Sequence, residues 1–77
     1  MPASPAHKRS QRLIEAEAYR RIMAGEEPAT LGEFAQQLSA WLRASYPNAA
    51  PMTLTAIEQQ IRETWDRRHE LILGGEL

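Results

Sequence analysis

Side chains that carry out enzyme chemistry are few in this sequence and follow no recognised spacing. His7 and His69 form no His-x-x-x-His pair and there is no cysteine, so no metal-ligand pattern is present. No serine lies in a Gly-x-Ser-x-Gly turn, and no glycine-rich loop precedes a phosphate-binding lysine. Glu26 and Glu27 are neighbours at an expected solvated turn, whereas acid–base catalysis would need one acid desolvated and another group opposite it. We therefore expect no enzyme activity, no metal site and no cofactor.

The reading of DNA bases is the other chemistry to weigh. Residues 54–73 are expected to form a helix, on which Thr55, Gln59 and Arg62 face outward, and glutamine and arginine can read base edges. A helix that approaches phosphates needs a basic or neutral outer face. This one carries more acid than base: Glu58, Glu63, Asp66 and Glu70 against Arg62, Arg67 and Arg68. Binding to a protein is thus favoured, and a small DNA-binding repressor remains the alternative.

The first helix along the chain is an amphipathic helix expected at residues 11–24. Ile14, Ala18 and Ile22 recur at every fourth position, which is typical of a helix that buries one face. Gly25 can adopt the left-handed conformation that ends such a helix. Residues 1–10 hold prolines, small residues and Lys8 and Arg9 without an apolar block, and they are expected to form a flexible tail.

Two further helices are expected at residues 31–45 and 54–73. Thr30 and Glu33 have the spacing of a capping box, and Thr53 is preferred to Thr55 as the next N-cap. The last helix should bury Leu54, Ile57, Ile61 and Trp65 on one face, and Gly74-Gly75 should end it. No segment has the pattern of a strand. The sequence predicts an all-α, compact three-helix domain of helix-turn-helix-like type over residues 11–75.

The segment Thr30 to Leu38, TLGEFAQQL, supports the helix-turn-helix-like interpretation. Its Ala35 is the small residue that lets a second helix pack closely, with Phe34 and Leu38 beneath it. The connection that follows departs from the motif, because about ten residues with two prolines replace the usual turn of three or four. The angle between the helices is therefore open.

Composition limits the remaining possibilities. The chain has 77 residues, enough for one small domain, and a formal net charge of −1, so it has no overall attraction to nucleic acid or anionic lipid. The lack of cysteine fits a reducing compartment, and no apolar run approaches the ~20 residues of a membrane span. A cytoplasmic location without membrane contact is expected.

Apolar side chains that a small core does not readily absorb are candidates for partner binding, together with two arginines of the last helix. These candidates are Leu13, Tyr19, Met23, Tyr46, Arg62, Arg67 and Leu73.

Two stretches resemble a known family. They are TLGEFAQQL and Ile61-Arg62-x-x-Trp65-x-Arg67-Arg68-x-x-Leu71-Ile72-x-Gly74-Gly75. The likeness, over about residues 13–75, is to the QseM-like small antiactivators of rhizobial integrative and conjugative elements, whose helical domain is shared with the C-terminal part of the FseA excision activator.

The resemblance implies a protein that silences two protein activators. One is a LuxR/TraR-type quorum-sensing regulator and the other is an FseA-type excision activator, so excision and conjugative transfer of the element would be repressed. The chain departs from DNA-contacting members in the outward acids Glu63, Asp66 and Glu70. This departure argues against direct DNA binding.

Overall fold

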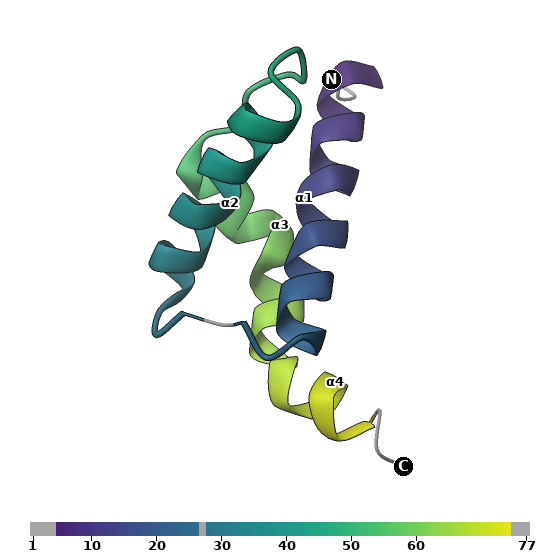
Figure 1. The fold of residues 1–77 in the computed structure, drawn as a ribbon, viewed down its shortest axis with the longest axis vertical. Coiled ribbons are helices and arrows are strands. Elements are labelled where there is room, and N and C mark those ends of the chain that lie inside the picture. Colours follow the sequence, from purple (N-terminus) through teal and green to yellow (C-terminus); the bar gives the residue numbers. More distant parts are fainter. Residues whose placement is uncertain (1–4, 27, 75–77) are drawn as a thin grey trace.

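The structure is a computed structural model that describes residues 5–26 and 28–74, with side chains over residues 7–26 and 28–71. Its helices are α1 (Pro5–Met23), α2 (Leu31–Ser45), α3 (Leu54–Asp66) and α4 (Arg68–Gly74). Helix α3 packs against both α1 and α2, and the short α4 lies at the end of the molecule remote from the start of α1 (Figure 1). The described chain has no strand, so the predicted all-α, three-helix architecture is confirmed, with a short fourth helix added.

The core lies where one face of each long helix meets the others. The α1 positions predicted from the four-residue period, Ile14, Ala18 and Ile22, are fully buried. Helix α2 contributes Phe34, Ala35, Leu38 and Leu42, and α3 contributes Ile57, Ile61 and Trp65. Burial of each large apolar side chain stabilises the fold by roughly 1.5–3 kcal/mol before entropy is counted.

Three helix ends follow from local sequence as predicted. The Thr30 hydroxyl accepts from the Glu33 amide at 3.1 Å, and the Thr53 hydroxyl accepts from the Ala56 amide at 3.1 Å. Gly25 has a φ of 80°. Its amide donates to the Ile22 carbonyl, and the next amide, of Glu26, donates to the Arg21 carbonyl, which is the Schellman pattern. Helix α2 occupies the predicted residues 31–45.

The start of α1 differs from the prediction. The helix begins at Pro5 and not at residue 11, so residues 5–10 are helical and are not a flexible tail, while residues 1–4 lie outside the described part. Proline suits the first helical position, because its missing N–H has no partner there in any case. Ser10 is fully buried and donates to the Ala50 carbonyl at 2.6 Å. This contact over forty positions of sequence fixes the early turns of α1 to the loop between α2 and α3.

The expected helix over residues 54–73 is also different, because it is divided at Arg67 into α3 and α4. Arg67 has φ −100° and ψ 12°, outside the helical range. The Arg68 guanidinium donates to the Trp65 carbonyl at 2.8 Å and lies 4.0 Å from the Trp65 ring centroid. That carbonyl would accept the amide of residue 69 in a continuous helix, so this side chain favours the break. At the other end of α3, Leu54 is 43% exposed and lies outside the core in which it was expected.

Candidate partner-binding surfaces

A groove runs between α1 and the α3–α4 segment. It comprises two concavities of about 450 and 230 Å³ that share Glu15, Tyr19 and Thr64. We call this surface the α1–α3 groove; its lining residues are Arg12, Glu15, Ala16, Tyr19, Glu63, Thr64, Arg67 and Leu71. Tyr19 is 48% exposed, and Met23, one turn further along α1, is 41% exposed. The side chains of Tyr19 and Met23 are therefore large, apolar and exposed to solvent beside a concave surface.

The rim of the α1–α3 groove is polar and internally paired. The Gln60 amide donates to the Glu15 carboxylate at 2.9 Å and so joins the two walls. Arg67 lies 3.2 Å from Glu70 and 3.8 Å from Glu63. Exposed pairs of this kind add little stability, but they fix the orientation of the side chains around the groove.

The structure brings some of the predicted partner-binding residues together and separates others. Tyr19 and Arg67 line the same concavity, with Met23 next to Tyr19 on α1. Tyr46 lies in the loop after α2, at a different site, and Arg62 is exposed on α3. Leu13 is partly buried against the core, which reduces the area it can offer to a partner. Leu73 is within α4, but its side chain is outside the described residues.

The three residues proposed for DNA reading form one exposed row along α3. Thr55, Gln59 and Arg62 are all exposed and follow each other at spacings of four and three. The next member of the row is Asp66, which is also exposed. Among the described side chains of α3 and α4, the exposed acids are Glu63, Asp66 and Glu70, whereas the exposed arginines are Arg62 and Arg67. A phosphate backbone along this row would meet carboxylates as well as Arg62.

A buried carboxylate on α1 was missed by the sequence analysis. The side chain of Glu17 is only 9% exposed. It accepts two hydrogen bonds from Arg20, at 2.9 and 2.8 Å, and one from Arg21 at 2.7 Å. Hydrogen bonding from Arg20 is the main cause that lowers the pKa of Glu17 to about 2, with Arg21 adding to the effect against desolvation. The spacing of three and four residues between acid and arginines was the signal available in the sequence.

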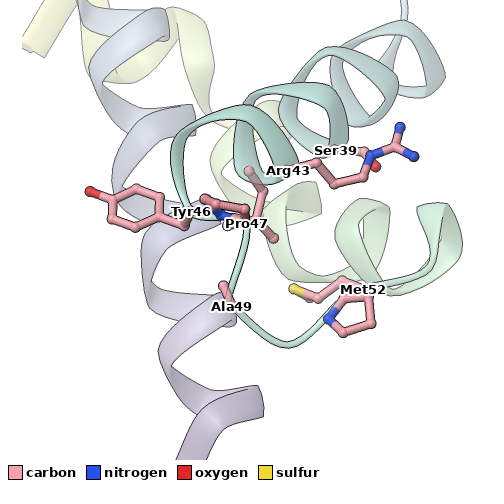
Figure 2. A pocket seen from close by; sticks show the side chains of 8 residues that line it. Ser39, Arg43, Tyr46, Pro47, Ala49 and Met52 are labelled. Carbon is pink, nitrogen blue, oxygen red and sulfur yellow. The ribbon is translucent and has the colours of Figure 1, made fainter.

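A second concave site lies at the end of the molecule where α1 begins and α2 ends. Its cavity of about 360 Å³ is bounded by the last turns of α2 and the loop after it, and an adjacent hollow of about 240 Å³ shares Tyr46, Pro47 and Ala49 with it. Figure 2 shows the Tyr46 hydroxyl and the Arg43 guanidinium pointing outward on opposite sides of the cavity. The ring of Tyr46 packs edge-on to Trp41, with centroids 5.6 Å apart, and lies 5.8 Å from the Arg9 guanidinium.

Three comparisons with known proteins found no similar protein. No protein-family model, no curated protein and no solved structure matches it. Within the described residues, no three side chains of the metal-binding types come together, and no helix has the length and apolar character to cross a membrane. A functional proposal for this chain therefore rests on its own sequence and surfaces.

Proposed function

We propose that this chain is a small antiactivator that binds transcriptional activators and represses excision and conjugative transfer of a mobile element. The partners proposed are a LuxR/TraR-type quorum-sensing regulator and an FseA-type excision activator. The choice of these partners rests on the resemblance of the TLGEFAQQL and C-terminal segments to the QseM-like family. The proposal that the ligand is a protein, and not DNA, rests on the α1–α3 groove.

The observation that carries the proposal is the pairing of exposed apolar side chains with a concave, charge-bordered surface. Tyr19 and Met23 are each more than 40% exposed beside the α1–α3 groove. Aromatic and methionine side chains are enriched in protein interfaces, where their burial supplies most of the binding energy. Arg67 at the same groove can exchange its exposed carboxylate partners for those of a ligand.

The mechanism that fits this surface is occlusion. A small domain seated on an activator covers whatever surface that activator uses for self-association or for contact with the transcription machinery. Repression then follows from a higher affinity for the inactive activator than for the active one, since a ligand shifts an equilibrium only by its differential affinity.

An affinity pull-down tests the proposal: this chain, immobilised, should capture the LuxR/TraR-type and the FseA-type activator from cells that contain both. Tyr19→Ala together with Met23→Ala should weaken capture at least about tenfold, because truncation of a central aromatic anchor typically costs 2 kcal/mol or more. Leu54→Ala is a matched control, since Leu54 is equally exposed but lies outside the α1–α3 groove. Equal capture by the double variant and the native chain would contradict the role of the groove, and absence of both activators would contradict the proposed function.

The alternative is a DNA-binding repressor that uses the row Thr55, Gln59 and Arg62, which is exposed and correctly spaced. A mobility-shift assay at moderate salt separates the two functions. Sequence-selective binding that is lost in Gln59→Ala and Arg62→Ala would favour the repressor. We expect no such binding, because Asp66 continues the row and Glu63 and Glu70 border it.

A further inference from the structure

Two groups of basic side chains in this protein differ in their partners. Arg20, Arg21 and Arg67 form ion pairs with carboxylates of α1, α3 and α4. The second group is exposed and enters none of the ion pairs in residues 7–26 and 28–71; its members at the start of α1 and the end of α2 are Lys8, Arg9, Arg12 and Arg43. We call these four residues, with Tyr46, the basic end.

The basic end exists because residues 5–10 are helical. The hydrogen bond from Ser10 to the Ala50 carbonyl holds the first turns of α1 against the loop after α2, and this places Arg9 beside Tyr46. Arg9 lines the smaller hollow and Arg43 lines the larger cavity. The residues shared by the two concavities, Tyr46, Pro47 and Ala49, therefore have a cation on each side. No acidic residue is among the described side chains that line either concavity.

The interior of the larger cavity is largely apolar between these charges. Its apolar lining consists of Leu42, Met52 and Pro51, together with Pro47 and Ala49, which also line the smaller hollow. A volume of about 360 Å³ is at the lower end of the range for ligand sites and is larger than one aliphatic side chain requires. A complementary ligand therefore has an apolar group for the cavity and negative charge on either side of it.

This combination favours a protein segment over nucleic acid. Phosphates would satisfy the cations, but a nucleic acid carries no aliphatic side chain to fill a cavity lined by leucine, methionine and proline. A peptide with aspartate or glutamate on both sides of a leucine has both features. We propose that the basic end binds an acidic segment of a partner protein, with one apolar side chain in the cavity and carboxylates beside Arg9 and Arg43.

The surface is held in place before any ligand binds. The Tyr46 amide donates to the Leu42 carbonyl at 2.8 Å, and the Ala49 amide donates to the Tyr46 carbonyl at 2.9 Å. The edge-on contact of Tyr46 with Trp41 and the bond from Ser10 fix the loop from its two sides. A site ordered in this way loses little conformational entropy on binding. Arg12 also lines the α1–α3 groove, but the two concavities at the basic end share no lining residue with that groove. Either site can therefore fail without the other.

Fluorescence anisotropy with labelled synthetic peptides tests the inference on the full chain at low salt. The first peptide has one leucine between two aspartate pairs, the second has serine for the leucine, and the third has asparagine for every aspartate. The first should bind, the second should bind roughly tenfold more weakly through loss of apolar burial, and the third should not bind measurably. Binding of the first should weaken as salt is raised.

Variants locate the binding. Arg9→Glu combined with Arg43→Glu should reduce affinity for the first peptide at least about tenfold, and Arg9→Gln with Arg43→Gln should reduce it less. Arg62→Glu is the matched control, because Arg62 is an exposed arginine of α3 outside both concavities. Circular dichroism confirms that each variant is folded, and Tyr19→Ala should leave the affinity for this peptide unchanged.

Four results would overturn the inference. They are equal binding of the asparagine peptide, an equal loss in Arg62→Glu, tighter binding of a duplex DNA of similar length than of the acidic peptide, and no binding of any peptide at millimolar concentration. Absence of activator capture by the native chain, with peptide binding retained, would instead count against the proposed function alone.

Discussion

The two ends of this molecule use their charges in opposite ways. At the end that holds α4, arginines are matched with carboxylates: Arg20 with Glu17 and Glu26, and Arg67 with Glu63 and Glu70. At the basic end, the exposed Arg9 and Arg43 lie on either side of a concave apolar surface and are left out of the described ion pairs. Paired charges orient local structure and largely cancel at a distance, whereas unmatched charges of one sign attract a partner of the opposite sign.

The two tryptophans sharpen this comparison, because each end has one. Trp65 is 8% exposed, packs against Phe34 with ring centroids 5.5 Å apart, and lies under the Arg68 guanidinium. Trp41 is only partly buried and packs against Tyr46. Stability should therefore depend more on the ion-paired end, and attraction of an acidic segment more on the basic end.

The largest expected effect is the loss of stability in Trp65→Ala. Removal of a nearly buried indole leaves a cavity among α2, α3 and α4, and should lower the free energy of unfolding by about 3–5 kcal/mol. Trp41→Ala should lower it by roughly half as much, because that ring is partly solvated already. Urea denaturation followed by circular dichroism measures both. Equal losses would contradict the contrast between the ends.

The Glu17 cluster should give the next largest effect. Its carboxylate has a pKa of about 2 in the fold and about 4.5 when unperturbed. A depressed pKa means that the contribution is fully present above pH 4.5 and is lost as the pH falls towards 2. After allowance for screening at the exposed Arg20, this contribution is about 2 kcal/mol.

Denaturation measured between pH 7 and pH 2 checks this contribution. Glu17→Gln should lower stability at pH 7 by about 2 kcal/mol and should flatten the decline between pH 4.5 and 2. Glu33→Gln is the control, since Glu33 is an exposed acid on α2 that forms none of the described ion pairs. A decline of the same steepness in Glu17→Gln would assign the acid sensitivity to other groups.

Features decided by neighbouring residues were predictable from the sequence. The threonine caps, the left-handed Gly25 and the extent of α2 each depend on a few adjacent side chains, and the core of α1 follows from its four-residue period. The start of α1 was not predictable in this way, because it depends on Ser10 meeting a carbonyl at Ala50. The break at Arg67 was not predictable, because the apolar period of residues 54–73 continues across that position.

The candidate surfaces were predictable only in part, for a related reason. Exposure of Tyr19, Met23 and Tyr46 agrees with their choice as candidates, and partner binding by these residues stays a prediction. Periodicity separates inward from outward positions on one helix, yet it does not show which outward positions of two helices form a groove. The meeting of Arg9 with Tyr46 needed both the helical first turns and the fold of the loop.

The smallest of the three effects concerns Ser10, and it tests whether the basic end is held by the hydrogen bond from Ser10 to Ala50. Ser10→Ala removes the 2.6 Å bond and leaves the Ala50 carbonyl without that donor, which should lower the free energy of unfolding by about 1–2 kcal/mol. Hydrogen exchange should then quicken at the Ala49 amide, which bonds to Tyr46, but not at the Glu26 amide at the other end. Because the variant keeps all four cations, a weaker acidic-peptide affinity would indicate that their placement, and not only their charge, creates the binding surface. Unchanged exchange at Ala49 would show instead that the loop is held by its contacts with α2 alone.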